Sequence, residues 1–241
     1  MARIDGRAND QLRPVEILPG INRFAEGSCL IRCGNTHVLC TASVEERTPP
    51  HVPEGEGWVT AEYSMLPRAN RERSRRDISK LKLSPRSAEI QRLVGRALRA
   101  AVDLKKLGER TITIDCDVFQ GDGGTRTASV TGGFVALSYA CWKLVEEGVI
   151  PEMPITTCVA AVSAGIVDDV PMLDLCYEED SSAMVDLNCV MNHEGEIIEL
   201  QGTGEGRAFT IAEQRQLVDL CAKGIREIQA IQKAVLEGGD A

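Results

Sequence analysis

The sequence predicts an α+β fold with mixed, largely antiparallel sheets and packed helices. Segments with strand-like alternation come in groups, and strong helical patterns are confined to three stretches. The order of strands, helix, strand, helix, strands, helix is typical of α+β proteins rather than of doubly wound sheets. With 241 residues, 43% of them hydrophobic and 26% charged, the chain can bury a substantial core. We expect one domain over residues 1–241.

The first half of the chain combines strands with one well-marked helix. Short alternating runs broken by glycine-containing turns predict an antiparallel meander over residues 15–47, and residues 57–65 predict another strand. Ser84 followed by Pro85 is a helix start, after which apolar residues keep helical spacing as far as Gly108. Residues 112–118 predict the next strand, because every second residue is apolar.

The second half is expected to be rich in strands between two helices. A helix is predicted over residues 127–148, and the capping box formed by Thr210 and Glu213 opens a last helix that runs to about residue 236. The expected strands between these helices cover residues 155–167, 172–177, 185–191 and 196–201.

The segment FQGDGGTRTASV, residues 119–130, predicts an anion-binding turn between a strand and a helix. Gly121, Gly123 and Gly124 fall where bare backbone N–H groups can converge on an oxyanion. Arg126 adds a guanidinium fork that matches phosphate. The alternative is a tight turn followed by a surface arginine.

Arg86 lies in the first turn of the helix that Ser84 and Pro85 start. A cation at a helix N-terminus is unfavourable for the helix dipole unless an anion binds there. This position therefore indicates a second anion ligand. A solvent-facing arginine paired with Glu89 is an equally good interpretation of this segment alone.

Two aspartates form a candidate site for a divalent cation. Glu178, Glu179 and Asp180 are expected in a turn between two strands, and Asp186 follows on the second strand, on the face opposite Val185. An inward-facing carboxylate is costly unless it is paired or binds a metal. Oxygen ligands of this kind suit magnesium or manganese. The alternative is a hairpin whose acidic residues face solvent.

The net charge of −9 argues against a nucleic-acid partner, but its distribution argues for one. Residues 68–86 contain eight basic and two acidic residues, whereas the rest of the chain contains 19 basic and 34 acidic ones. One cationic segment on an acidic protein attracts a polyanion to a single place. A solvated, disordered charge run is the alternative.

The remaining composition indicates an intracellular protein without zinc. The nine cysteines are odd in number, form no Cys-x-x-Cys pair and are expected to be reduced core residues, and the three histidines are scattered. No stretch approaches the roughly 20 apolar residues of a membrane span, and no signal peptide is visible, so we expect a cytoplasmic location without a membrane.

Taken together, four segments of the chain resemble the bacterial ribonuclease PH family, the phosphorolytic exoribonucleases that trim the 3′ ends of tRNA. The resemblance covers nearly the full length. The segments are MARIDGR with LRP at residues 1–14, EIQRLVGRALR at 89–99, DGGTRTAS at 122–129, and residues 174–188 with the acidic pair.

The resemblance implies a fold, an assembly and a set of site residues. The implied fold is RNase PH-like, also described as ribosomal protein S5 domain 2-like, and the implied assembly is a homohexamer built as a trimer of dimers. Asp180 and Asp186 would be the catalytic, metal-associated acids. Arg86 with Gly124, Thr125 and Arg126 would hold inorganic phosphate, and Arg68, Arg71, Arg73 and Arg76 would serve ring assembly and tRNA binding. The chain departs from the family in lacking glycines just before Arg86.

The expected activity is therefore a phosphate-dependent 3′→5′ exoribonuclease that trims tRNA precursors. Phosphate would release nucleoside 5′-diphosphates with Mg²⁺ or Mn²⁺ as cofactor, and the reaction would be a reversible nucleotidyl transfer. Two alternatives are a catalytically silent ring subunit that grips RNA and a metal-dependent hydrolytic nuclease. A nucleotide kinase is disfavoured because the glycine turn has no Gly-Lys-Ser/Thr sequence.

Overall fold

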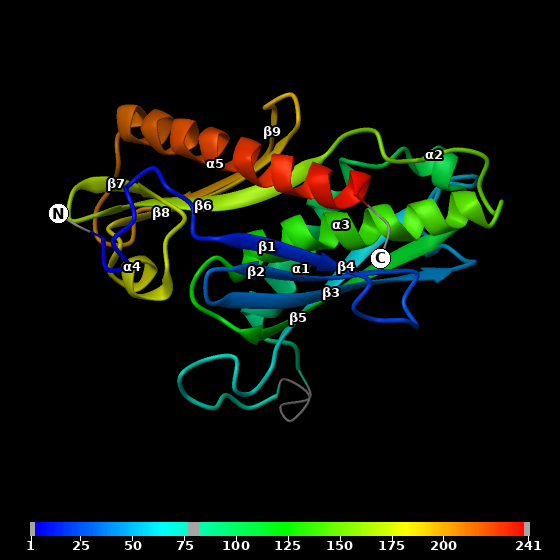
Figure 1. Ribbon diagram of the computed structural model, residues 1–241, viewed down its shortest axis with the longest axis horizontal. Helices are drawn as coiled ribbons and strands as arrows, with labels where there is room; N and C mark the ends of the chain where they lie inside the picture. The colour runs from blue at the N-terminus through cyan, green and yellow to red at the C-terminus, as the bar shows by residue number, and fades with distance from the viewer. Residues whose placement is uncertain (1–2, 77–81, 239–241) are drawn as a thin grey trace.

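The computed structural model describes residues 3–76 and 82–238 and contains two β-sheets with helices between and beside them (Figure 1). The first sheet has the strand order β1-β2-β3-β5-β4. Its strands are β1 (Val15–Pro19), β2 (Gly27–Cys33), β3 (Thr36–Glu45), β4 (Trp58–Met65) and β5 (Thr111–Gln120). The meander predicted for residues 15–47 is confirmed, because β1, β2 and β3 pair antiparallel in sequence order.

One pairing of the first sheet is parallel. β3 pairs antiparallel with β5, but β4 runs parallel to β5 at the edge of the sheet. Parallel neighbours need a crossover connection, and α1 (Pro85–Arg99) with the short α2 (Leu104–Leu107) supplies it. The predicted, largely antiparallel α+β arrangement therefore holds with this one exception.

The second sheet is antiparallel throughout, in the order β7-β6-β8-β9. It consists of β6 (Val159–Val167), β7 (Val170–Leu173), β8 (Val185–Asn192) and β9 (Ile197–Thr203). Every residue of β6 is buried, because the strand is covered on both faces. Alternate residues of β8 pack with the last helix, α5 (Ile211–Glu237), and this places Asp186 on the other face, as the sequence predicts.

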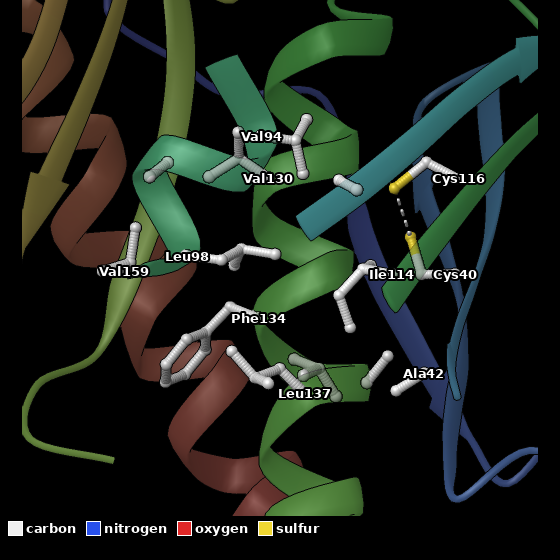
Figure 2. Packing of buried hydrophobic residues seen from close by; sticks show 14 of the residues in the cluster. Cys40, Ala42, Val94, Leu98, Ile114, Cys116, Val130, Phe134, Leu137 and Val159 are labelled. Atoms are coloured by element: carbon white, nitrogen blue, oxygen red, sulfur yellow. Dashed lines mark hydrogen bonds between the residues drawn. The ribbon is translucent and has the colours of Figure 1, made fainter. Parts of the chain in front are cut away.

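The long helix α3 (Thr125–Glu146) forms the centre of the molecule between the two sheets. Its side chains meet α1 and the first sheet, and its inner face also reaches Val159 of β6 (Figure 2). Phe134 and Leu137 are among the largest fully buried side chains. Because α3 is packed on several sides, its first turn is rigidly placed, and this turn carries Arg126.

The length and hydropathy of α3 depart from one prediction made from the sequence. Taken alone, this 22-residue helix has the length and mean hydropathy of a membrane span, contrary to our expectation that no stretch approaches one. However, 78% of its most apolar window is buried inside the protein, as in the core helix of a globular fold.

Several boundaries differ from the sequence prediction. α1 ends at Arg99 instead of continuing to Gly108, because Asp103 caps the separate helix α2. β6 begins at Val159, after irregular residues that include two prolines. β7 ends at Leu173, because Asp174 takes a left-handed backbone conformation with φ of 53°. The turn expected at residues 178–180 is instead the short helix α4 (Tyr177–Ser182).

The cysteines occupy the interior, as predicted. Seven of the nine are buried and the other two are half-buried, and all are free thiols. Cys40 and Cys116 face each other across β3 and β5 with 3.9 Å between their sulfur atoms (Figure 2). Burial raises the pKa of Cys141 and Cys158 to about 12, so these thiols stay protonated at neutral pH.

Candidate functional site

The glycine turn after β5 needs glycine at two positions for steric reasons. Gly123 and Gly124 have φ values of 74° and 65°, and Gly124 caps α3 in a left-handed conformation. A Cβ on Gly123 would lie 2.5 Å from the carbonyl oxygen of Leu175, just before α4. The turn is thus packed directly against the segment that leads to Asp180.

The N–H groups available to an anion are fewer than the sequence suggested. Gly121 donates its N–H to the carbonyl of Ala69 at 2.8 Å, and Asp122 donates to Oγ1 of Thr36 at 2.9 Å. These two N–H groups are therefore used within the protein. In residues 3–76 and 82–238, no acceptor is found for the N–H groups of residues 123–126, which open α3.

Arg126 is half-buried and is held by two side chains from other elements. Its Nη1 donates to Oε1 of Glu89 on α1 at 3.2 Å and to Oε1 of Gln201 on β9 at 2.8 Å. Gln201 also donates from Nε2 to the same oxygen of Glu89 at 3.0 Å. The three side chains form a closed triangle that fixes the guanidinium while leaving its other nitrogens for a ligand. Glu89 and Gln201 were not predicted as site residues.

Arg86 is exposed in the first turn of α1, where the sequence placed it. Ser84 caps this helix by accepting the N–H of Ser87 at 3.0 Å, which confirms the predicted start. Arg86 is solvent-facing, as its alternative interpretation required, but within the described residues Glu89 pairs with Arg126 and no ion pair joins it to Arg86. Burial raises the pKa of Tyr63 on β4, whereas Thr125, Arg86 and Arg126 lower it. Because these neighbours come from the first turns of α1 and α3, the two helices begin side by side next to Tyr63.

Asp180 and Asp186 lie close to each other, with Arg126 near both carboxyl groups and Arg86 near Asp180. The residue Asp180 is exposed, but surrounding protein atoms raise the pKa of its carboxyl group, while Arg86 and Arg126 lower it. Burial raises the pKa of Asp186 to about 6, with Asp180 adding to the rise and Arg126 opposing it. The predicted phosphate ligands and the predicted acids are therefore brought together at one end of the molecule.

The hydrogen bonding of the Asp186 carboxylate leaves one of its oxygens available to a divalent cation. Its Oδ2 accepts a hydrogen bond of 3.0 Å from Asn188, two residues along β8. Its Oδ1 is buried and has no hydrogen-bond donor within the described part of the chain. A buried, unpartnered carboxylate oxygen is unfavourable unless a cation binds it. Asp180 and Asp186 therefore fit Mg²⁺ or Mn²⁺, which keep several waters beside one or two carboxylates.

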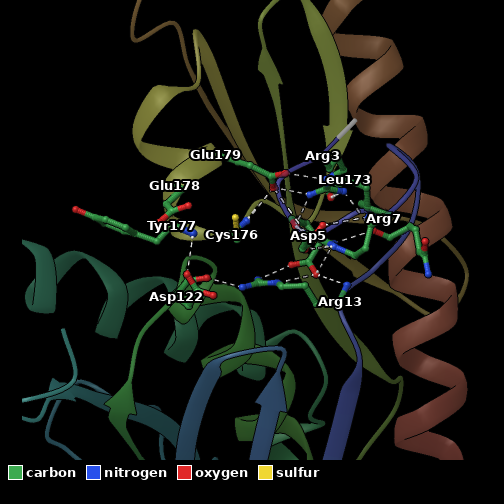
Figure 3. A network of polar contacts seen from close by, with 12 residues as sticks. Arg3, Asp5, Arg7, Arg13, Asp122, Leu173, Cys176, Tyr177, Glu178 and Glu179 are labelled. Carbon is green, nitrogen blue, oxygen red and sulfur yellow. Dashed lines mark hydrogen bonds and ion pairs between the residues drawn. The ribbon is translucent and has the colours of Figure 1, made fainter. Parts of the chain in front are cut away.

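A buried cluster of arginines and acids ties the N-terminal segment to α4 and to the glycine turn (Figure 3). Arg13 binds both oxygens of Asp174, with its Nη2 2.6 Å from Oδ1, and also donates to the carbonyl of Asp122. Arg3 binds both oxygens of Glu179 at 2.9 and 2.6 Å. The N-terminal segment thus fixes the residues immediately before Asp180.

No local pattern in the sequence predicts these pairs. Arg3 and Glu179 are 176 positions apart, and Arg13 and Asp174 are 161 apart. The MARIDGR segment is one of those that resemble the family, so its arginines could be suspected of a role. The spacing of charges along the chain does not show which acidic residues they bind. The left-handed conformation of Asp174 could not be predicted from the sequence either, because aspartate tolerates this conformation without requiring it.

The predicted RNA-binding arginines lie on the loop between β4 and α1, which projects from the body of the protein (Figure 1). Arg68, Arg71, Arg73 and Arg76 are all exposed. The loop meets the glycine turn through Ala69, and Arg71 pairs with Glu178 of α4. Lys80, part of the predicted basic segment, lies outside the described residues.

Two family models match the chain in succession. The 3′ exoribonuclease family, domain 1, matches residues 11–142, and domain 2 of the same family matches residues 157–223. Ribonuclease PH of Syntrophomonas wolfei is 53% identical over 237 residues, covering 98% of this chain and 99% of the relative. Ribonuclease PH of Solibacter usitatus is 52% identical, covering 98% of this chain and 100% of the relative.

Solved structures share the fold at lower identity. Rice (Oryza sativa) Rrp46 superposes with a TM-score of 0.79 at 17% identity, covering 97% of this chain and all of that one. An Archaeoglobus fulgidus exosome with RNA bound to the active site gives 0.78 at 24% identity, covering 95% and 92%. Since the two family models match most of the chain and the curated relatives match it almost end to end, the chain belongs to the ribonuclease PH family of 3′ exoribonucleases.

Proposed function

We propose that this chain uses the site formed by α1, α3, α4 and β8 to remove nucleotides from the 3′ ends of tRNA precursors by phosphorolysis. As a member of the ribonuclease PH family, it is a phosphate-dependent 3′→5′ exoribonuclease with nucleotidyltransferase activity. The observation that carries the site assignment is that Arg86 and Arg126 both lie near Asp180, and that Arg126 and Asp180 in turn lie near Asp186.

In the proposed reaction, orthophosphate is the nucleophile. Arg86, Arg126 and the backbone N–H groups of Gly124 and Thr125 hold it at the N-terminus of α3. A phosphate oxygen attacks the last internucleotide phosphorus, the bond from phosphorus to the upstream 3′ oxygen breaks, and a nucleoside 5′-diphosphate leaves. One of the two acids, Asp180 or Asp186, gives a proton to the departing 3′ oxygen. One ester is exchanged for a phosphoanhydride, so the reaction is reversible.

Asp180 and Asp186 are the proposed ligands of a magnesium or manganese ion. Support comes from the unpartnered buried Oδ1 of Asp186 and from the closeness of the two carboxylates. The chemistry that such an ion would supply is neutralisation of charge at the reacting phosphorus. Asn188 keeps the other oxygen of Asp186 occupied and so fixes the direction in which Oδ1 points.

We further propose that Arg68, Arg71, Arg73 and Arg76 contact RNA or a neighbouring copy in a homohexamer arranged as a trimer of dimers in the cytoplasm. Their exposure on one projecting loop supports this role, since cationic side chains on an acidic protein gather phosphates locally. One solved structure that shares the fold is that of an archaeal exosome core. Steep loss of RNA binding with rising salt is expected.

The decisive experiment omits phosphate. A tRNA precursor with extra 3′ nucleotides is incubated with the protein and Mg²⁺, with and without orthophosphate, and the released nucleotides are identified. We expect nucleoside 5′-diphosphates only when phosphate is present, and extension of the RNA when diphosphates are in excess. Release of monophosphates without phosphate would instead indicate a hydrolytic nuclease, and no release under either condition would indicate a silent RNA-binding subunit.

Gln201 should affect phosphate affinity through Arg126. The Gln201→Glu variant places a second carboxylate against this guanidinium and reduces the positive charge available to phosphate. We expect the KM for phosphate to rise about 3- to 30-fold, with a much smaller change in RNA affinity. Gln216→Glu, on the exposed side of α5, is the control for net charge. A lower kcat at unchanged KM would contradict this role.

A further inference from the structure

Tyr177, the first residue of α4, is unusual among the aromatic side chains of this chain. Only 4% of the residues are aromatic, and Tyr177 is 53% exposed. It lines a groove of about 630 Å³ with Asn70, Arg71, Arg73 and Asp122, next to the glycine turn. Other exposed aromatics, such as Phe24 and Trp142, do not line this groove, so Tyr177 combines exposure with a polar setting that includes two arginines.

The backbone of Tyr177 is fixed from both sides. Its N–H donates to Oδ1 of Asp122 at 3.2 Å, which joins it to the glycine turn. Two residues later, Glu179 completes the capping box of α4 and is itself held by Arg3. Figure 3 shows the ring directed away from this buried cluster. An aromatic ring on such a backbone loses little conformational freedom when a ligand packs against it.

The groove has the two components that proteins use to bind single-stranded nucleic acid. Arg71, which also pairs with Glu178, and Arg73 supply positive charge for the phosphates beside two acidic lining residues, Glu72 and Asp122. The ring of Tyr177 supplies a flat apolar face. Every nucleobase has a π-face, so such a surface binds RNA with little sequence preference. Asp180 lies one helical turn further along α4.

We propose that Tyr177 is a stacking platform for a base near the 3′ end of bound RNA. The inference rests on the proposed function and adds a specific binding residue to it. The stacked base would anchor the strand beside α4, so that the last internucleotide phosphorus can reach Asp180 and the phosphate site. Because stacking is independent of base identity, the residue would contribute affinity for any 3′ end. The hydroxyl group of Tyr177 has no partner within the described ranges, so the ring carries the role.

The test measures binding of a short single-stranded RNA without phosphate. A fluorescent 2-aminopurine placed in turn at each of the last three positions reports stacking through quenching. Loss of the ring in Tyr177→Leu or Tyr177→Ala should weaken binding about 5- to 150-fold and abolish the quenching at one position. Tyr177→Phe keeps the ring and should bind and quench like the wild type. Phe24→Ala, at a distant exposed aromatic, is the control.

The outcomes separate this inference from the proposed function. Equal RNA affinity of Tyr177→Leu and the wild type would overturn the stacking role, even if phosphorolysis were established. Weaker binding of Tyr177→Phe would overturn it too, because the hydroxyl would then be required. RNA degradation without phosphate would contradict the proposed reaction but leave the binding result intact. A fall in Tm of Tyr177→Leu with unchanged RNA affinity would indicate a structural role instead.

Discussion

The Asp186→Asn variant is expected to lose about 10²- to 10⁴-fold in kcat for phosphorolysis, the range found when a positioned acid or base is removed. The same change should stabilise the metal-free protein. Burial raises the pKa of Asp186 to about 6, so at neutral pH its charge is held in an unfavourable setting. Asparagine has the same shape and no charge. The free energy of unfolding should rise by on the order of 1–3 kcal/mol at pH 7.

The pH dependence of this stabilisation has a definite sign. Since the pKa of Asp186 is higher in the folded protein than in the unfolded chain, the folded state binds more protons between about pH 4 and 6. The contribution of Asp186 to stability therefore falls as the pH rises through this window. Below it, both states are protonated, and the difference between Asp186→Asn and the wild type should disappear. Thermal unfolding in EDTA from about pH 3 to 8 measures this.

Adding magnesium gives a second readout that does not depend on activity. Mg²⁺ should raise the Tm of the wild type and not that of Asp186→Asn, because a ligand at a hundredfold excess over its Kd adds about 2.7 kcal/mol to the folded state. Asp168→Asn, at an exposed aspartate in the turn between β6 and β7, should change neither stability nor activity. Equal stabilisation of both variants by Mg²⁺ would place the ion elsewhere.

The sequence could predict those parts of the fold that depend on local patterns. The strand alternation around Ile114, the serine–proline helix start at Ser84 and the capping box at Thr210 are all present as expected. Each reflects interactions within a few residues of chain, such as caps and side-chain period. The face on which Asp186 lies followed from the same alternation, because neighbouring strand residues point to opposite faces.

The sequence could not predict contacts that depend on residues far apart in the chain. Local spacing offers Glu89 as a partner of Arg86, three positions away, but α1 packs against α3 and Glu89 pairs with Arg126. The glycine pattern predicts that Gly121 binds an anion, but its N–H donates to the carbonyl of Ala69 in the neighbouring loop. Helix α4 was expected as a turn, because its packing against the arginines of the N-terminal segment could not be read locally.

The buried pair of Arg13 and Asp174 makes the strongest prediction for stability. Both residues are 5% exposed, and Asp174 receives three hydrogen bonds from Arg13. Burial alone would raise the pKa of Asp174, but Arg13 and Arg7 hold it below its ordinary value of 3.8. Asp174→Ala leaves a buried arginine without its partner and should lower the free energy of unfolding by about 3–5 kcal/mol.

The two partners are expected to be strongly coupled. Replacing Arg13 with methionine should destabilise the protein in the same way, while the double variant Arg13→Met with Asp174→Ala should be destabilised by much less than the sum. Glu16→Ala removes an exposed pair with Arg32 at 2.8 Å and should change stability by about 1 kcal/mol or less. Additive effects of the two buried changes would contradict the pairing.

Charge and backbone conformation at Asp174 can be separated by Asp174→Asn. Asparagine tolerates the left-handed conformation as aspartate does, so this variant removes the charge while keeping the backbone. Because the pKa of Asp174 is lowered on folding, the stability that the charge contributes is present above about pH 4 and is lost as the pH falls through the lowered value. The stability difference between Asp174→Asn and the wild type should therefore shrink in acid. Since Arg13 also binds the carbonyl of Asp122, we expect kcat to fall along with stability in this variant, as α4 and the glycine turn lose their common anchor.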